Sequence, residues 1–233
     1  MAPIDPAVLV QTRLDLHAVA EHVLMADLHH HTGRIGLRGA PGGFATPVYE
    51  TRAGARRLRV EHTEVVAELD GAPVGRAALT TLGEIREALG IEAPTPTDLY
   101  PLATDADAGR ALRVDREAAD LVATVFAATD TALGTLRAEA AAEREGGDAG
   151  LPTAQLWPEH FDLAVTIDEV NYGGSPGDAE HEEPYLYVGP HALPPPDGTL
   201  WNEPFGSSRP ALPPPTGIEA LEFFRAGRAA LSP

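Results

Sequence analysis

The chain contains neither cysteine nor lysine among its 233 residues. Without cysteine it has no disulfide, no thiolate nucleophile, no iron–sulfur cluster and no cysteine-ligated zinc site. Without lysine it has neither a Schiff-base nucleophile nor the lysine of a P-loop, which contacts the nucleotide phosphates. Its 17 basic residues are therefore all arginines.

Long apolar runs and positive charge are also scarce. No stretch approaches the roughly 20 apolar residues that span a bilayer, and the first residues have neither the basic region nor the apolar core of a signal peptide. Against 35 acidic residues, the arginines leave a formal charge of −18. Nucleic acid and anionic membranes are therefore poor partners, and we expect a cytoplasmic protein.

Apolar periodicity predicts the fold class. A spacing of three to four residues favours helices at 6–28, 115–144 and 217–230. Alternating patterns predict strands within 32–82, with a hairpin turn at Asp70-Gly71, and within 157–190. Because strands cluster apart from the long helices, we expect an α+β fold. Its mostly antiparallel sheet is packed by three main helices in a single domain, 1–233.

A proline-rich segment follows the last of these strands. ALPPP occurs at 192–196 and again at 211–215. We interpret 191–215 as a surface wrap of polyproline II segments, with Trp201 and Phe205 as buried anchors. A docking motif for a partner domain is the alternative.

Residues 157–190 hold the densest set of reactive side chains. Alternation from His160 to Asp168 predicts a strand that places His160 and Asp162 on one face. A long loop, 169–184, then carries His181 and several acids, and loops of that length are often functional. A second strand, 185–188, follows. Tyr185 and Tyr187 on its one face would form the walls of a ligand pocket.

Three interpretations of this hairpin are open. His160, Asp162 and His181 could bind a divalent transition metal, since two histidines and a carboxylate suit such an ion. Alternatively, His160 and Asp162 could be catalytic without metal, as a base and the group that orients it. The third interpretation is a solvated sheet face beside an acidic loop.

Arginine and acid are concentrated in different parts of the chain. Arginines gather in residues 32–60, including Arg57 and Arg59, whereas acids gather in 143–183. The two regions could pair with each other inside one fold. Otherwise, Arg57 and Arg59 could bind a small anionic ligand, because guanidinium groups recognise carboxylate and phosphate.

Four motifs carry a resemblance to a known family. WPEHFDLAVTIDEVNYGGSPGD and EPYLYVGP, with PGGFATP upstream and WNEPFG downstream, resemble a family of uncharacterised actinobacterial-type proteins. The resemblance covers most of the chain and implies a bacterial, cytoplasmic protein with no assigned reaction. The run His29-His30-His31 is not part of that pattern.

Two functions from different classes follow. The first is a small-molecule-binding protein or enzyme with its site in residues 160–187. The alternative is a non-catalytic interaction protein that docks through the proline-rich segment and the acidic loop.

Overall fold

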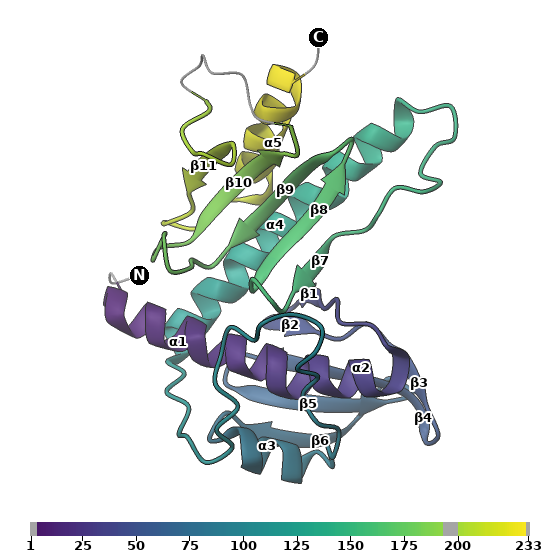
Figure 1. Cartoon of the computed structure of the whole chain (residues 1–233), viewed down its shortest axis with the longest axis vertical. Helices are drawn as coiled ribbons and strands as arrows, with labels where there is room; N and C mark the ends of the chain where they lie inside the picture. The colour runs from purple at the N-terminus through teal and green to yellow at the C-terminus, as the bar shows by residue number, and fades with distance from the viewer. Residues whose placement is uncertain (1–3, 193–199, 232–233) are drawn as a thin grey trace. The chain divides into compact units, whose positions relative to one another are not determined.

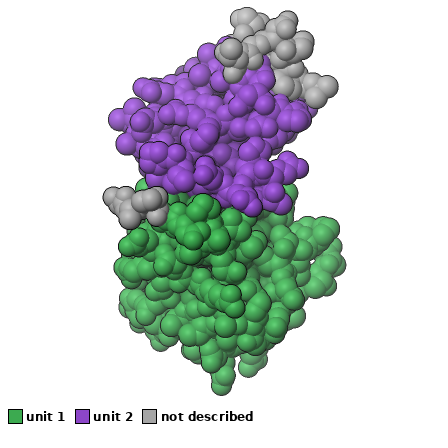
Figure 2. Space-filling model, turned by 90° about the vertical axis from the view of Figure 1, so that its left-hand side faces the viewer, with its two compact units in different colours: residues 1–124, 156–161 green, residues 125–155, 162–233 purple. Residues whose placement is uncertain are grey.

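The computed structural model describes residues 4–192 and 200–231, whose elements are labelled in Figure 1. The chain divides into two compact units, coloured separately in Figure 2: unit 1 is 1–124 with 156–161, and unit 2 is 125–155 with 162–233. The α+β class with antiparallel sheets is confirmed, but the strands form two sheets where we predicted one. Alternation predicts a strand without identifying its partner. The single domain stays a prediction.

A long helical run opens unit 1. It comprises α1 (Pro6–Val19), a π-helical turn η1 (Ala20–Met25) and α2 (Ala26–Thr32). Asp5 caps its start by accepting a hydrogen bond from the backbone N–H of Ala7 at 2.9 Å, and Gly33 ends it with a φ of 69°. The helix predicted over 6–28 is confirmed and extends to Thr32.

This run buries polar as well as apolar side chains. The carboxylate of Glu21, which is fully buried, accepts hydrogen bonds from the backbone N–H groups of Ala103 and Thr104, at 3.1 and 2.9 Å. The hydroxyl of Thr104 donates a third at 2.5 Å. Burial lowers the pKa of the neighbouring His22, so its imidazole is neutral at pH 7. These hydrogen bonds hold the connector between α3 and α4 against η1.

The sheet of unit 1 has the order β1-β2-β4-β5-β6, with β3 paired to β4. The predicted hairpin at Asp70-Gly71 is confirmed, with φ values of 51° and 79°. A second reversal lies at His62, whose φ is 57°. The elements are β1 (Arg38–Ala40), β2 (Gly43–Ala45), β3 (Tyr49–Thr51), β4 (Gly54–Glu61), β5 (Glu64–Leu69), β6 (Ala72–Ala78) and α3 (Leu82–Ala88).

Two helices accompany the second sheet. Helix α4 (Arg116–Ala142) contains the unit boundary, and α5 (Gly217–Leu231) ends the described chain. A capping box opens α5: Glu219 N–H donates to the Thr216 hydroxyl, and Thr216 N–H donates to the Glu219 carboxylate. Within residues 4–192 and 200–231, no helix is long and apolar enough to cross a membrane.

The second sheet has the order β11-β10-β9-β8-β7. Its members are β7 (Gln155–Trp157), β8 (Asp162–Ile167), β9 (Val170–Ser175), β10 (Tyr185–Pro190) and β11 (Ser207–Pro210). The predicted loop over 169–184 was wrong in its first half, which forms β9. The strand β11 was not predicted within the proline-rich segment. Residues 193–199, which hold most of the first ALPPP, lie outside the described residues.

Two adjacent glycines in β9, Gly173 and Gly174, are oriented toward opposite faces of this sheet. A Cβ on Gly174 would lie 2.2 Å from the Thr129 hydroxyl oxygen, so α4 packs closely on that face. On the same face, α5 places Gly227 against Val188, where a Cβ would lie 2.8 Å from the valine side chain. We call this side the helix face and the opposite side the polar face.

Candidate functional site

The register of unit 2 gathers polar and aromatic side chains on one side of the sheet. Tyr185 pairs with Ser175 on β9, and Tyr187 pairs with Gly173 on β9 and with Ser208 on β11. Directly paired residues project to the same side of a sheet. The polar face therefore carries Asp162, Ser175, Tyr185, Tyr187 and Ser208.

The ring of Tyr187 lies across β9 over Gly173. A Cβ at position 173 would stand 2.5 Å from Cζ and 2.6 Å from the hydroxyl oxygen of Tyr187. By crossing at this glycine, the hydroxyl reaches β8 and donates a hydrogen bond to the Asp162 carboxylate. Glycine inside a strand is typical of such a close approach. Both Gly173 and Gly174 therefore lie inside a strand, within the segment that we predicted to be a loop.

The loop between β9 and β10 is folded around Asp178. One carboxylate oxygen accepts hydrogen bonds from the backbone N–H groups of Glu180 and His181, both at 2.7 Å. The other oxygen accepts from the hydroxyl of Tyr185 at 2.5 Å. Asp178 thus joins the loop to the polar face of β10.

His181 lies between two carboxylates. Its Nε2 is 3.0 Å from Oε1 of Glu203, and its Nδ1 is 3.9 Å from Oδ1 of Asp178. The hydroxyl of Ser208 donates to the same Glu203 oxygen at 2.6 Å. This network joins the loop to β11 and to the segment that precedes it.

Burial and hydrogen bonding set the charges of these groups. Burial raises the pKa of Tyr185, and the hydrogen bond to Asp178 raises it further. Burial and the charge of Asp162 likewise hold the pKa of Tyr187 well above its usual value. Burial acts to raise the pKa of Asp178, but hydrogen bonds from Tyr185 and the backbone outweigh it and lower that pKa. At neutral pH the polar face therefore combines neutral phenols with charged carboxylates.

Four rings form an aromatic row along this face: His181, Tyr185, Tyr187 and Phe205. Successive centroids are 4.8, 6.1 and 6.4 Å apart. Phe205 is 39% exposed, so its predicted burial was wrong. It instead meets Tyr187 edge-on, with an interplanar angle of 88°. The row is a partly exposed aromatic surface on which a ligand could stack.

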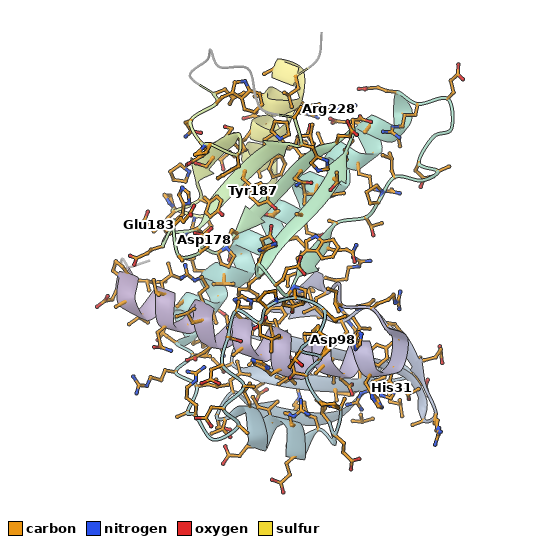
Figure 3. The ribbon with its side chains drawn as sticks, viewed as in Figure 1. His31, Asp98, Asp178, Glu183, Tyr187 and Arg228 are labelled. Atoms are coloured by element: carbon orange, nitrogen blue, oxygen red, sulfur yellow. The ribbon has the colours of Figure 1, made fainter. Side chains whose placement is uncertain are left out.

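A cavity of about 520 Å³ opens beside the first two rings of this row. Figure 3 labels Asp178 and Glu183 on the β9–β10 loop and Tyr187 on β10. We call the cavity the acidic groove, because three glutamates and no arginine belong to its lining. The lining residues are Ala179, Glu180, His181, Glu182, Glu183, Pro184, Tyr185, Ser208 and Pro210.

The predicted geometry of His160 was wrong. His160 lies in a turn, and its side chain is 72% exposed. The strand begins only at Asp162, after Phe161 adopts a φ of 53°. His160 and Asp162 therefore do not share a strand face. Throughout 4–192 and 200–231, no group of three or more histidine or acidic side chains is placed to hold a metal ion. The predicted metal set with His181 is not assembled.

Arg57 and Arg59 lie on β4 of unit 1. Arg59 is 2.8 Å from Glu68 and 3.0 Å from Glu61, and Arg57 is 4.0 Å from Glu68. The first of our two interpretations, in which these arginines pair with acids in residues 143–183, is therefore wrong for Arg57 and Arg59. Their role in ligand binding stays a prediction.

The structure brings four of the predicted residues into one site: Asp162, His181, Tyr185 and Tyr187. It also shows three members that the sequence did not indicate, namely Gly173, Glu203 and Ser208. Gly173-Gly174 was a usable signal, since paired glycines within a strand indicate close packing on both faces. Glu203 and Ser208 carried no signal, because the strand β11 that holds Ser208, and the segment before it that holds Glu203, were not predicted to fold against β10.

Comparison with known proteins adds no identification. No family model, curated protein or solved structure matches the chain. The resemblance to an actinobacterial-type family stays a prediction.

Proposed function

We propose that this chain is a small-molecule-binding protein whose ligand occupies the acidic groove and contacts the aromatic row. The observation that carries the proposal is the placement of Tyr187, whose ring lies on Gly173 and whose hydroxyl is bonded to Asp162. A ring held at both ends keeps its orientation without a ligand, and such preorganisation lowers the entropic cost of binding.

The neighbouring cavity supports the same proposal. A volume of about 520 Å³ lies within the range of about 300–1,000 Å³ that is typical of ligand sites. His181 and Tyr185 belong both to its lining and to the aromatic row. A ligand in the groove would therefore contact rings as well as carboxylates. We propose binding and no particular reaction. The cytoplasmic location also stays a proposal.

Fluorine NMR of protein labelled with 3-fluorotyrosine tests this proposal. The chain has five tyrosines, and single Tyr→Phe variants assign their signals. In a screen of small fragments, we expect binders to shift the signals of Tyr185 and Tyr187. Tyr172 is buried on the helix face, so its signal is the internal control. Binders that shift only other tyrosines, or a screen with no binder, would contradict the proposal.

A second candidate is docking of a protein partner through the described part of the proline-rich segment. Leu212 and Ile218, at or just after it, are 40% and 71% exposed, and exposed apolar side chains are common in interaction surfaces. This function predicts a complex that Trp201→Ala weakens while the fluorotyrosine response to fragments is unchanged. A pull-down with the wild type and this variant tests it.

A further inference from the structure

We infer that the ligand of the acidic groove is a small organic cation of the alkylated-ammonium class. This inference rests on the proposed binding function and adds the charge and chemistry of the ligand. It is argued from the lining of the groove, the hydrogen bonding of its carboxylates and the adjoining rings.

The charges around the groove favour a cation. Glu180, Glu182 and Glu183 belong to the lining, and Asp178 belongs to the same loop between β9 and β10. Arg209 lies between the lining residues Ser208 and Pro210 in the sequence, but in β11 its side chain projects to the opposite face of the sheet. There it donates to the carbonyl oxygen of Glu219 at 3.2 Å. A cation would gain from this field, whereas an anion would be repelled.

The more buried carboxylates have already accepted hydrogen bonds from the protein. Both oxygens of Asp178 are occupied, by two backbone N–H groups and by the Tyr185 hydroxyl. Asp162 accepts from Tyr187, and Glu203 accepts from Ser208 and contacts His181. Their negative charge remains, but fewer lone pairs are left for the ligand. A primary ammonium brings three N–H donors that need acceptors, whereas a fully alkylated ammonium brings none.

The aromatic row supplies the complementary surface. The ring faces of tyrosine, phenylalanine and tryptophan attract cations through the quadrupole of the π system, and quaternary ammonium groups are often bound in this way. In the groove lining that ring is Tyr185. The rings of His181 and Tyr185 are 4.8 Å apart and both belong to the groove lining. The methyl groups of an alkylated ammonium can pack on such rings, while its charge interacts with the surrounding carboxylates.

A pair of ligands that differ only in charge tests the inference. Choline and its neutral carbon isostere, 3,3-dimethylbutan-1-ol, have the same shape, so their affinities can be compared in the fluorotyrosine assay. We expect choline to shift the Tyr185 signal and to bind at least about tenfold more tightly than the isostere. We also expect its affinity to fall with added salt. Butylammonium is the comparison for the alkyl groups and should bind more weakly than choline.

Matched charge variants locate the effect. Glu183→Gln removes one exposed carboxylate of the groove and should weaken choline binding by about two- to threefold, with no change for the isostere. Glu222→Gln removes an exposed carboxylate on α5 that does not belong to the groove lining. It should leave both affinities unchanged. Both positions are exposed, so circular dichroism should show unchanged folds.

The outcomes separate this inference from the proposed function. Equal binding of choline and the isostere would overturn the choice of a cation, and tighter binding of butylammonium would overturn the alkylated class. Binding of other fragments but not of choline would also overturn the inference. In all three cases the binding function would remain. If no fragment shifts Tyr185 or Tyr187, the proposed function itself fails.

Discussion

Replacing Gly173 by alanine is the most direct perturbation of the polar face. The added methyl group would lie within 2.7 Å of three atoms of Tyr187: Cζ, the hydroxyl oxygen and Cε1. These atoms are at the far end of a side chain, so we expect the ring to move aside rather than the backbone. Gly173 is not among the glycines with positive φ, so alanine causes no backbone strain there. The cost should therefore come from Tyr187 alone.

The magnitude follows from the hydrogen bond that is lost. A hydrogen bond to a charged group contributes about 1.5–3 kcal/mol. Replacing glycine by alanine at a compatible position returns about 0.4–1 kcal/mol by restricting the unfolded chain. We therefore expect a net loss of about 1.5 kcal/mol in the free energy of unfolding. For a chain of this size, that corresponds to a fall in Tm of roughly 3–6 °C.

Calorimetry and a tyrosine titration together test this reasoning. Gly173→Ala should lower the Tm and return the pKa of Tyr187, now raised by burial and by Asp162, toward its usual value. In a Tyr187→Leu background the same substitution should cost little, so the double-mutant cycle should show coupling. An unchanged Tm and titration in the single variant, or an equal loss in both backgrounds, would refute the proposed role of this glycine.

Three further predictions concern other parts of the molecule. Tyr172→Phe should remove a phenol with a pKa of about 12, raised by burial, from the ultraviolet titration and leave fragment binding unchanged; a lost transition near pH 10 would contradict this. Asp178→Asn should be less stable than the wild type at pH 7. Because the pKa of Asp178 is lowered below 3.8 in the folded state, its contribution is present above that pH and lost below it, so the stability difference in urea denaturation should shrink as the pH falls below about 4. Glu21→Gln should lower the free energy of unfolding by about 2 kcal/mol, since the amide NH₂ that replaces one carboxylate oxygen cannot accept the backbone hydrogen bond now made to that oxygen. An unchanged urea midpoint would show that other contacts hold the connector.

The helices and their ends were the most predictable part of the fold. Their signals are local: an apolar stripe, a capping side chain and a terminating glycine lie within a few residues of one another. The helix predicted from residue 115, for example, is capped by Asp115, whose carboxylate accepts from the Ala118 N–H at 3.0 Å. Capping geometry needs no knowledge of the rest of the chain.

The strand β9 was missed for a physical reason. Glycines are rare inside strands, so we predicted a loop there. They are required for packing: Gly173 accommodates Tyr187 and Gly174 accommodates Thr129. The true turn lies at Asp168-Glu169, where two residues other than glycine adopt φ values of 52° and 61°. Such a turn is held by the pairing of Ile167 with Val170 rather than by its own sequence preference.

The candidate site was predictable only where side chains follow one regular strand. Tyr185 and Tyr187 share a face of β10, as their spacing predicts. His160 and Asp162 have the same spacing, but the positive φ of Phe161 between them breaks the alternation. Contacts of Asp178 and Glu203 depend on how a loop and an unpredicted strand fold against β10, which no local pattern specifies.

The two faces of the unit 2 sheet allow stability and binding to be separated experimentally. Gly174→Ala would bring a Cβ to 2.2 Å from the Thr129 hydroxyl on α4, so it perturbs the helix face as Gly173→Ala perturbs the polar face. Both variants lie in β9 and add one methyl group, and both should lower the Tm. Only the Gly173 variant should also alter the Tyr187 signal and weaken choline binding. If both variants weaken binding equally, the effect comes from a general loss of stability, and the contact between Gly173 and Tyr187 has no specific role in binding.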